Sequence, residues 1–131
     1  MNKIIFHDVR DCNLEHIFKC GQCFRWESVN NGCQKYEYKE DSPKEIQRYI
    51  GIASKNTAIV EYELLTRELT IIGSGSEEFW RSYFDLDRDY GKIKETLISN
   101  DTKITEAINF GYGIRILNQD LWETILSFII S

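Results

Sequence analysis

Residues 49 to 73 read YIGIASKNTAIVEYELLTRELTIIG, and this stretch decides the fold class. It contains three runs that are rich in β-branched and aromatic residues, at Tyr49–Ser54, Ala58–Leu64 and Leu69–Gly73. Only the short polar segments 55–57 and 66–68 separate these runs, which leaves no room for an intervening helix. Since parallel strands need a long crossover connection, the spacing predicts an antiparallel meander.

The N-terminal residues predict further strands around one short helical turn. Lys3–Val9 has the composition of a strand, and Asn13 can cap a helical turn over Leu14–Phe18. The residues of Phe24–Val29 alternate between two faces, as they do in a strand. An Asn-Asn-Gly turn follows, and it predicts a hairpin between this strand and Tyr36–Lys39.

A helix is predicted after the Gly-Ser-Gly-Ser run that starts at residue 73. Ser74 and Glu77 have the spacing of a capping box, in which two side chains satisfy free backbone N–H groups at a helix start. Aromatic residues then recur at helical spacing, at Phe79, Trp80, Tyr83 and Phe84. We interpret this stripe as a buried helix face rather than a platform for stacking bases.

Three more helices are expected along the rest of the chain. Two of them span roughly Tyr90–Ile98 and Thr102–Phe110, and the glycines at 111 and 113 can end the second. The last begins at Asp120, which can cap it with Glu123 as the reciprocal partner.

The last helix, LWETILSFIIS, is apolar nearly all round. A helix of that kind is normally buried in the middle of a helical domain, so we expect the chain to stop inside the first helix of a second domain. The sequence therefore predicts an α+β fold, an antiparallel β-sheet with flanking helices that ends in the first helix of an all-helical domain.

Length and composition place the chain among ordinary globular proteins. Its 131 residues suffice for about one domain with a real core, and 42% are hydrophobic and 28% charged. No stretch is long and apolar enough to span a membrane, and the N-terminus lacks the apolar core of a signal peptide. The net charge of -5 argues against nucleic-acid binding through bulk electrostatics, so any DNA contact must be local or supplied from outside these residues.

Four cysteines raise the question of a sulfur site, because Cys20 and Cys23 have the spacing of redox and zinc motifs. A thioredoxin-like site needs its first cysteine at the start of a helix, whereas this pair leads into a predicted strand. A zinc site would need Cys12 and Cys33, with His7 or His16 as possible substitutes. The third interpretation, which we favour, is that the cysteines are small hydrophobic side chains in a core.

The remaining polar residues indicate no active site by themselves. Neither histidine has a serine or cysteine in the pattern of a nucleophile and its base. The carboxylates at Glu77, Glu78, Asp85, Asp87 and Asp89 lie at predicted helix ends and on polar faces, where helix dipoles and solubility explain them.

A resemblance to a known family carries the functional prediction. Residues 21–26 read GQCFRW and resemble the Gly-Gln-Ser/Cys-Phe-Arg-Trp motif of the bifunctional 8-oxoguanine DNA glycosylases of the helix-hairpin-helix superfamily. Residues 113–120 read GIRILNQD, and with the LSFI sequence at 126–129 they are similar to the entry into the catalytic domain of that family. YFDLD at 83–87 is similar to a third family segment. The three matches occur in the family's order and span nearly the whole chain.

The resemblance implies a two-part enzyme that removes 8-oxoguanine from duplex DNA. Residues 1–112 would form the N-terminal domain, which is likened to one repeat of the TATA-binding protein, and residues 113–131 would begin a truncated helix-hairpin-helix catalytic domain. The family's catalytic lysine and aspartate lie in the helical part beyond the matched residues. We therefore expect no catalytic residue in this chain and no activity from it alone.

The resemblance also implies which residues meet the substrate. The glycine of the motif, here Gly21, offers the family's lesion-reading backbone carbonyl. Arg25 and Trp26 would hold the loop from behind by hydrogen bonds and packing, with Phe24 as further support, while Gln22 would bond locally. No cofactor and no metal is implied.

The expected partners are damaged duplex DNA, bound through the full-length protein, and the missing C-terminal helical domain, with no membrane. The expected location is the cytoplasm of a bacterium or the nucleus of a eukaryote. Two other functions stay open: a non-catalytic zinc or thiol module that uses Cys20 and Cys23, and a self-sufficient interaction domain. The apolar final helix argues against the second, because an exposed helix of that kind would aggregate or recruit a partner.

Overall fold

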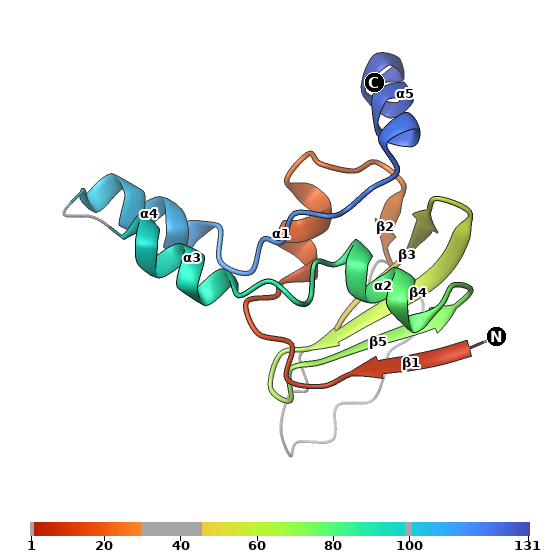
Figure 1. The fold of residues 1–131 in the computed structure, drawn as a ribbon, viewed down its shortest axis with the longest axis horizontal. Coiled ribbons are helices and arrows are strands. Elements are labelled where there is room, and N and C mark those ends of the chain that lie inside the picture. The colour runs from red at the N-terminus through yellow and green to blue at the C-terminus, as the bar shows by residue number, and fades with distance from the viewer. Residues whose placement is uncertain (1, 30–45, 99–100) are drawn as a thin grey trace.

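The computed structural model describes residues 2–29, 46–98 and 101–131. Five strands form one antiparallel sheet in the order β1-β5-β4-β3-β2 (Figure 1). They are β1 (Asn2–Phe6), β2 (Trp26–Ser28), β3 (Ile46–Ala53), β4 (Asn56–Glu63) and β5 (Glu68–Gly73). The predicted meander is confirmed as β3, β4 and β5.

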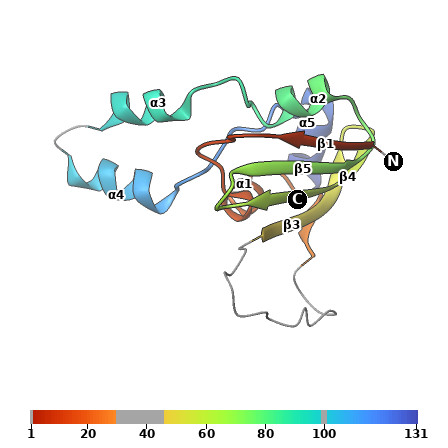
Figure 2. The ribbon, with the colours of Figure 1, turned by 90° about the horizontal axis from the view of Figure 1, so that it is seen from below.

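In the described part of the chain, five helices accompany the sheet: α1 (Leu14–Lys19), α2 (Glu77–Tyr83), α3 (Tyr90–Leu97), α4 (Thr102–Phe110) and α5 (Leu121–Ile130). Helices α1 and α2 pack their apolar residues into the core of the sheet. Figures 1 and 2 show α3 and α4 side by side, projecting from one end of the sheet, while α5 stands apart near β2. The predicted α+β architecture is confirmed.

The core forms on one face of the sheet because burial alternates along the strands. Val60 on β4 and Leu69 and Ile71 on β5 are at most 1% exposed, and they lie against Trp80 of α2 and Leu14 of α1, which are fully buried. This period of two is that of strands with one face packed on a core. The aromatic stripe of α2 is part of this core, as its helical spacing predicted.

Two local predictions need correction. Ser76, not Ser74, caps α2, because its hydroxyl accepts from the Phe79 N–H at 3.1 Å, whereas the Ser74 hydroxyl accepts from the Thr57 N–H. The strand predicted at Phe24–Val29 begins only at Trp26. The predicted hairpin partner, residues 36–39, lies outside the described residues, and β2 pairs with β3.

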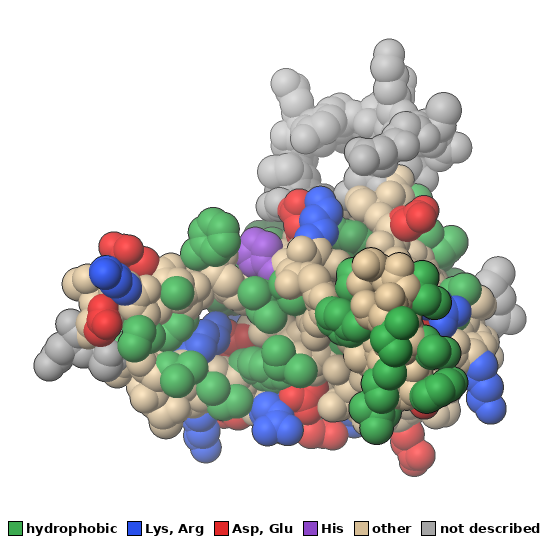
Figure 3. Space-filling view, turned by 90° about the horizontal axis from the view of Figure 1, so that it is seen from above, with side chains coloured by type: hydrophobic (Ala, Val, Ile, Leu, Met, Phe, Trp, Pro, Cys, Tyr) green, Lys and Arg blue, Asp and Glu red, His purple; other side chains and the backbone are tan. Residues whose placement is uncertain are grey.

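Helix α5 begins at Asp120 as predicted, with the carboxylate accepting from the Glu123 N–H at 2.9 Å. Its apolar side chains are nevertheless exposed, from 38% at Leu126 to 82% at Ile130. Figure 3 looks onto α5 and shows hydrophobic side chains gathered on this part of the surface. Among the described residues, no helix is long and apolar enough to cross a membrane.

Candidate functional site

The loop of residues 20–25 turns the chain from α1 into β2. Cys20 ends α1, and Gly21 follows with a φ of +92°. That dihedral favours glycine, because a side chain at positive φ is strained. A Cβ atom at Gly21 would meet nothing within 4 Å, so backbone conformation rather than crowding calls for glycine here.

The Gly21 carbonyl is an open hydrogen-bond acceptor. Gly21 is exposed, and within the part of the chain that the structure describes no donor bonds its carbonyl oxygen. A free carbonyl on a turn with a defined backbone conformation can accept one bond from a ligand. The sequence predicted this residue, and the structure places it where such a contact is possible.

Gln22 holds the loop to a distant part of the chain. Its side-chain Nε2 donates to the carbonyl of Ile17 at 3.0 Å and to that of Arg115 at 2.8 Å. Its Oε1 accepts from the Leu117 N–H at 2.9 Å, and its backbone carbonyl accepts from Gln119 Nε2. We predicted that Gln22 bonds locally, which is true only of the bond to Ile17. Its other partners lie more than 90 residues along the chain.

Trp26 anchors the far end of the loop in the core. Its ring stacks on Phe18 with centroids 4.6 Å apart and planes inclined by 14°. Its Nε1 donates to the Tyr83 hydroxyl at 2.9 Å, and burial of that hydroxyl raises the pKa of Tyr83. The predicted packing role of Trp26 agrees with this geometry.

Phe24 and Arg25 reach from the loop to α5. Arg25 Nη1 lies 2.5 Å from Glu123 Oε1, so Glu123 bonds an arginine instead of serving as the predicted reciprocal cap. The ring of Phe24, which is 51% exposed, meets the edge of Phe128 with centroids 5.3 Å apart. The loop and α5 are therefore joined by one ion pair and one aromatic contact.

The two cysteines of the loop lack the setting of a reactive pair. They follow the C-terminal end of α1, where the helix dipole disfavours a thiolate, rather than preceding a helix. Cys23 is 8% exposed, and burial raises the pKa of its thiol to about 12. Within the described ranges, no group of three or more His, Cys, Asp or Glu could hold a metal ion. Cys33 lies outside these ranges.

Residues 113–119 form an extended strap that packs beside the loop. The Gly113 carbonyl accepts from the Asn13 N–H at 3.0 Å, and a Cβ atom at Gly113 would lie 2.6 Å from Asn13 atoms. Gly113, Arg115 and Leu117 are buried, whereas Ile116 and Asn118 are exposed. The second matched motif is therefore a packed structural element of this domain.

The buried side chain of Arg115 anchors the strap to neighbouring segments. It is 4% exposed, and its Nη1 donates to the Asp85 carbonyl at 2.9 Å and its Nη2 to the Arg10 carbonyl at 2.5 Å. Its guanidinium lies 4.7 Å from the centre of the Tyr90 ring, and the Tyr90 hydroxyl donates to Asp85 Oδ2 at 2.7 Å. Burial acts to raise the pKa of Asp85, but hydrogen bonds from Tyr90 and Arg88 outweigh it and lower that pKa.

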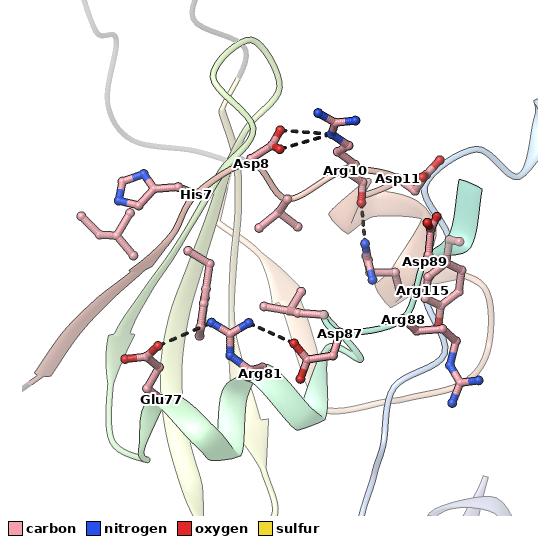
Figure 4. Close-up of a pocket in the computed structure, with 15 residues that line it drawn as sticks. His7, Asp8, Arg10, Asp11, Glu77, Arg81, Asp87, Arg88, Asp89 and Arg115 are labelled. Atoms are coloured by element: carbon pink, nitrogen blue, oxygen red, sulfur yellow. Dashed lines mark hydrogen bonds and ion pairs between the residues drawn. The ribbon is translucent and has the colours of Figure 1, made fainter. Parts of the chain in front are cut away.

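A hollow of about 520 Å³ lies between β1 and α2, with Arg115 in its lining (Figure 4). Its charges are paired with one another, as Arg81 with Asp87 at 3.1 Å and Arg10 with Asp8 at 3.2 Å. None of the predicted site residues lines it. The two histidines are also engaged elsewhere, His7 with Glu68 at 3.0 Å and His16 with the Tyr112 carbonyl at 2.6 Å.

Sequence reasoning missed Gln119 and Glu123 as partners of the loop. Both lie in or just after the GIRILNQD segment, and that segment was the only signal that could have pointed to them. Their contacts cross 97 and 98 residues of chain, which no local pattern predicts.

The fold is an α+β domain, and its loop exposes the Gly21 carbonyl beside residues that are bonded to the strap and to α5. Residues 4–125 match the family described as 8-oxoguanine DNA glycosylase, N-terminal domain. The chain belongs to this family. No curated protein matches the chain.

Solved structures of DNA repair enzymes share the fold. The structure of MBOgg1 in complex with a low-affinity DNA ligand is 41% identical with a TM-score of 0.76, over 98% of this chain and 39% of that one. The 8-oxoguanine glycosylase/lyase of Clostridium acetobutylicum is 41% identical with a TM-score of 0.74 in its apo form, over 99% of this chain and 40% of that one. The same enzyme is solved with double-stranded DNA containing cytosine opposite 8-oxoguanine, again at 41% identity and TM-score 0.74, over 98% of this chain and 39% of that one. The chain thus spans about two fifths of the length of these proteins.

Proposed function

We propose that this chain is the lesion-reading part of a DNA repair enzyme that removes 8-oxoguanine from duplex DNA and then acts as a lyase. The observation that carries the proposal is the Gly21 carbonyl, which is exposed and accepts no hydrogen bond from the described residues. Membership of the glycosylase family and the DNA-bound relatives support it.

One carbonyl is enough to tell the two bases apart. Guanine presents N7 as a bare acceptor. Oxidation at C8 turns N7 into an N–H donor, so a carbonyl aimed at N7 gains a bond with the oxidised base and faces a second acceptor in the normal one. Leaving the carbonyl unpaired in a closed site costs about 1 to 3 kcal/mol, and lone-pair repulsion adds to that cost. The base would be read outside the duplex, as in other enzymes that act on a single base.

The neighbours of Gly21 support its carbonyl and leave the base-facing side open. Gln22 bonds the strap, Trp26 lies in the core and Arg25 pairs with Glu123. Phe24, half exposed beside Phe128, is the one aromatic of the loop that could contact substrate.

The bond-breaking chemistry would belong to the rest of the protein. We propose that residues 113–131 lead into a helical catalytic domain whose lysine amine attacks C1′ and expels the base. That domain would cover the apolar side chains of α5, which remain exposed in this chain. It would also carry most of the positive DNA-binding surface, because this chain has a net charge of -5.

Substitutions at Gly21 in the complete protein test the role of the carbonyl. Gly21→Val forces the backbone away from a φ of +92° and should turn the carbonyl away from the base, so excision of 8-oxoguanine is expected to fall at least about tenfold. Incision at a preformed abasic site, where there is no base to read, should change little. Gly21→Asn is the matched control, since asparagine tolerates positive φ better and should retain more activity.

Two results would count against the proposal. Equal losses on 8-oxoguanine and on the abasic site would remove the carbonyl from base recognition. A complete wild-type protein that leaves 8-oxoguanine in place would overturn the function itself.

A further inference from the structure

We infer that Gln119 is a positioning residue, which holds the lesion-reading carbonyl of Gly21 in place through Gln22. The inference rests on the proposed function. Gln119 itself would not touch the base, because its Nε2 donates to the Gln22 backbone carbonyl on the strap side of the loop.

Glycine can adopt the positive φ that the loop needs, but it brings no side chain that could hold the backbone in place. With no side chain and nothing within 4 Å of its Cβ position, Gly21 has no side-chain contact that would restrain its backbone. The peptide that carries the Gly21 carbonyl also carries the Gln22 N–H. Its orientation must therefore be fixed from the Gln22 side.

Gln22 is held at both of its ends. Its side-chain amide pairs with Arg115 at 2.8 Å and with Leu117 at 2.9 Å, two positions apart on the strap, as a neighbouring strand would. Its backbone carbonyl is bonded by Gln119. With its side chain and its carbonyl both bonded, Gln22 keeps its Cα in place, so the preceding peptide can be re-aimed only through ψ of Gly21 and φ of Gln22.

The strap that bonds Gln22 is itself anchored to the rest of the domain. The Asn118 N–H donates to the Tyr83 carbonyl at 2.9 Å, and its side chain donates to the Ser82 carbonyl at 2.7 Å. Arg115, on the same strap, donates to the carbonyl of Asp85 just after α2 and to that of Arg10. The strap that carries Gln119 is thus bonded to residues 82–85 and to Arg10.

The donor, rather than the bulk of the side chain, should matter. Gln119→Glu keeps the shape but replaces the N–H donor with an oxygen that faces the Gln22 carbonyl, which repels it. The matched control is Asn109→Asp, which makes the same amide-to-carboxylate change at an exposed position on α4.

The experiment uses the complete protein and three measurements: single-turnover excision of 8-oxoguanine opposite cytosine, incision of a preformed abasic site, and the thermal midpoint. Gln119→Glu should slow excision about tenfold, the effect of losing about 1.4 kcal/mol of hydrogen bonding, and leave abasic-site incision within about twofold. Asn109→Asp should leave the ratio of the two rates unchanged.

The outcomes separate this inference from the function on which it rests. Wild-type excision with an equal rate for Gln119→Glu would overturn the positioning role alone. A parallel fall in both rates would make Gln119 a structural residue and overturn it as well. A wild-type protein without excision would overturn the proposed function before any variant is compared.

Discussion

The sheet with α1 and α2 differs from α5 in what happens to apolar side chains. Val60, Leu69 and Trp80 are 0% exposed in the first region, whereas Leu121, Ile129 and Ile130 are at least 74% exposed in the second. Both regions obey the same local rules, since α2 and α5 each begin at a capping side chain and carry large apolar residues. Local rules therefore determine where a helix forms, but only a packing partner determines whether it is buried.

The largest difference in stability between the two regions is expected when one tryptophan in each is replaced by alanine. Trp80→Ala should lower the free energy of unfolding by about 3 to 5 kcal/mol, because it leaves a cavity under the sheet. It also leaves the Ser74 carbonyl, now bonded at 3.0 Å, without its donor. Urea denaturation of the 131-residue chain measures the change.

Trp122→Ala is the matched control on α5, where the ring is 67% exposed. Its expected effect is within about 0.5 kcal/mol. Losses of similar size for the two variants would mean that α5 is packed as firmly as the core, and the contrast would fail.

Alkaline pH should weaken the core and not α5. Burial raises the pKa of Cys12 and of Cys23 to about 12, from a usual value of 9.0. Between these two values the unfolded chain loses both protons while the folded chain keeps them, so stability is full below pH 9 and falls as pH rises toward 12. Each thiol contributes a slope of about 1.4 kcal/mol per pH unit, measured as the free energy of unfolding against pH.

Cys12→Ala isolates one of these contributions. The variant should be less stable below pH 9, where the thiol is neutral in both states, and its slope above pH 9 should be smaller by one thiol, so the difference from the wild type should narrow as pH rises. An unchanged slope would show that Cys12 ionises equally in the folded and unfolded chains.

The smallest effect is expected on α5 itself. Ile129 is 74% exposed, so Ile129→Ser should change the stability of this chain by no more than about 0.5 kcal/mol. On the proposed function, the same change in the complete protein should cost about 2 kcal/mol or more, because the helical domain would bury the side chain. Calorimetry of the 131-residue chain and of the complete protein measures the two changes in stability.

Leu65→Ser provides the control, since Leu65 is 69% exposed in the turn between β4 and β5. It should have little effect at either length. If Ile129→Ser behaves like Leu65→Ser in the complete protein, the remainder of the protein does not cover α5 at Ile129.

Periodicity and capping residues predicted most of the fold. Val60 and Tyr62 are buried and Glu61 between them is only partly buried, which is the alternation that a strand requires. Asn13 and Asp120 cap the helices that they were expected to cap. The cap of α2 was wrong by two residues because Ser74 and Ser76 offer the same hydroxyl, and only the tertiary bond from Thr57 distinguishes them.

One motif proposed the members of the candidate site, including Gly21 and Trp26, but it could not predict their connections. The bonds from Gln22 to Arg115 and from Arg25 to Glu123 depend on how the chain returns to the loop after α2, α3 and α4, which no local pattern encodes.

The glycine turn also has a consequence for how such a protein can evolve. On the proposed function, the recognition group belongs to the backbone, which every amino acid shares, so no substitution deletes the Gly21 carbonyl. Mutation can only re-aim it, through the turn or through neighbours such as Gln22 and Gln119. Variants with altered base preference are therefore expected to arise in the supporting residues first, and a screen for new lesion specificities should randomise the strap before the loop.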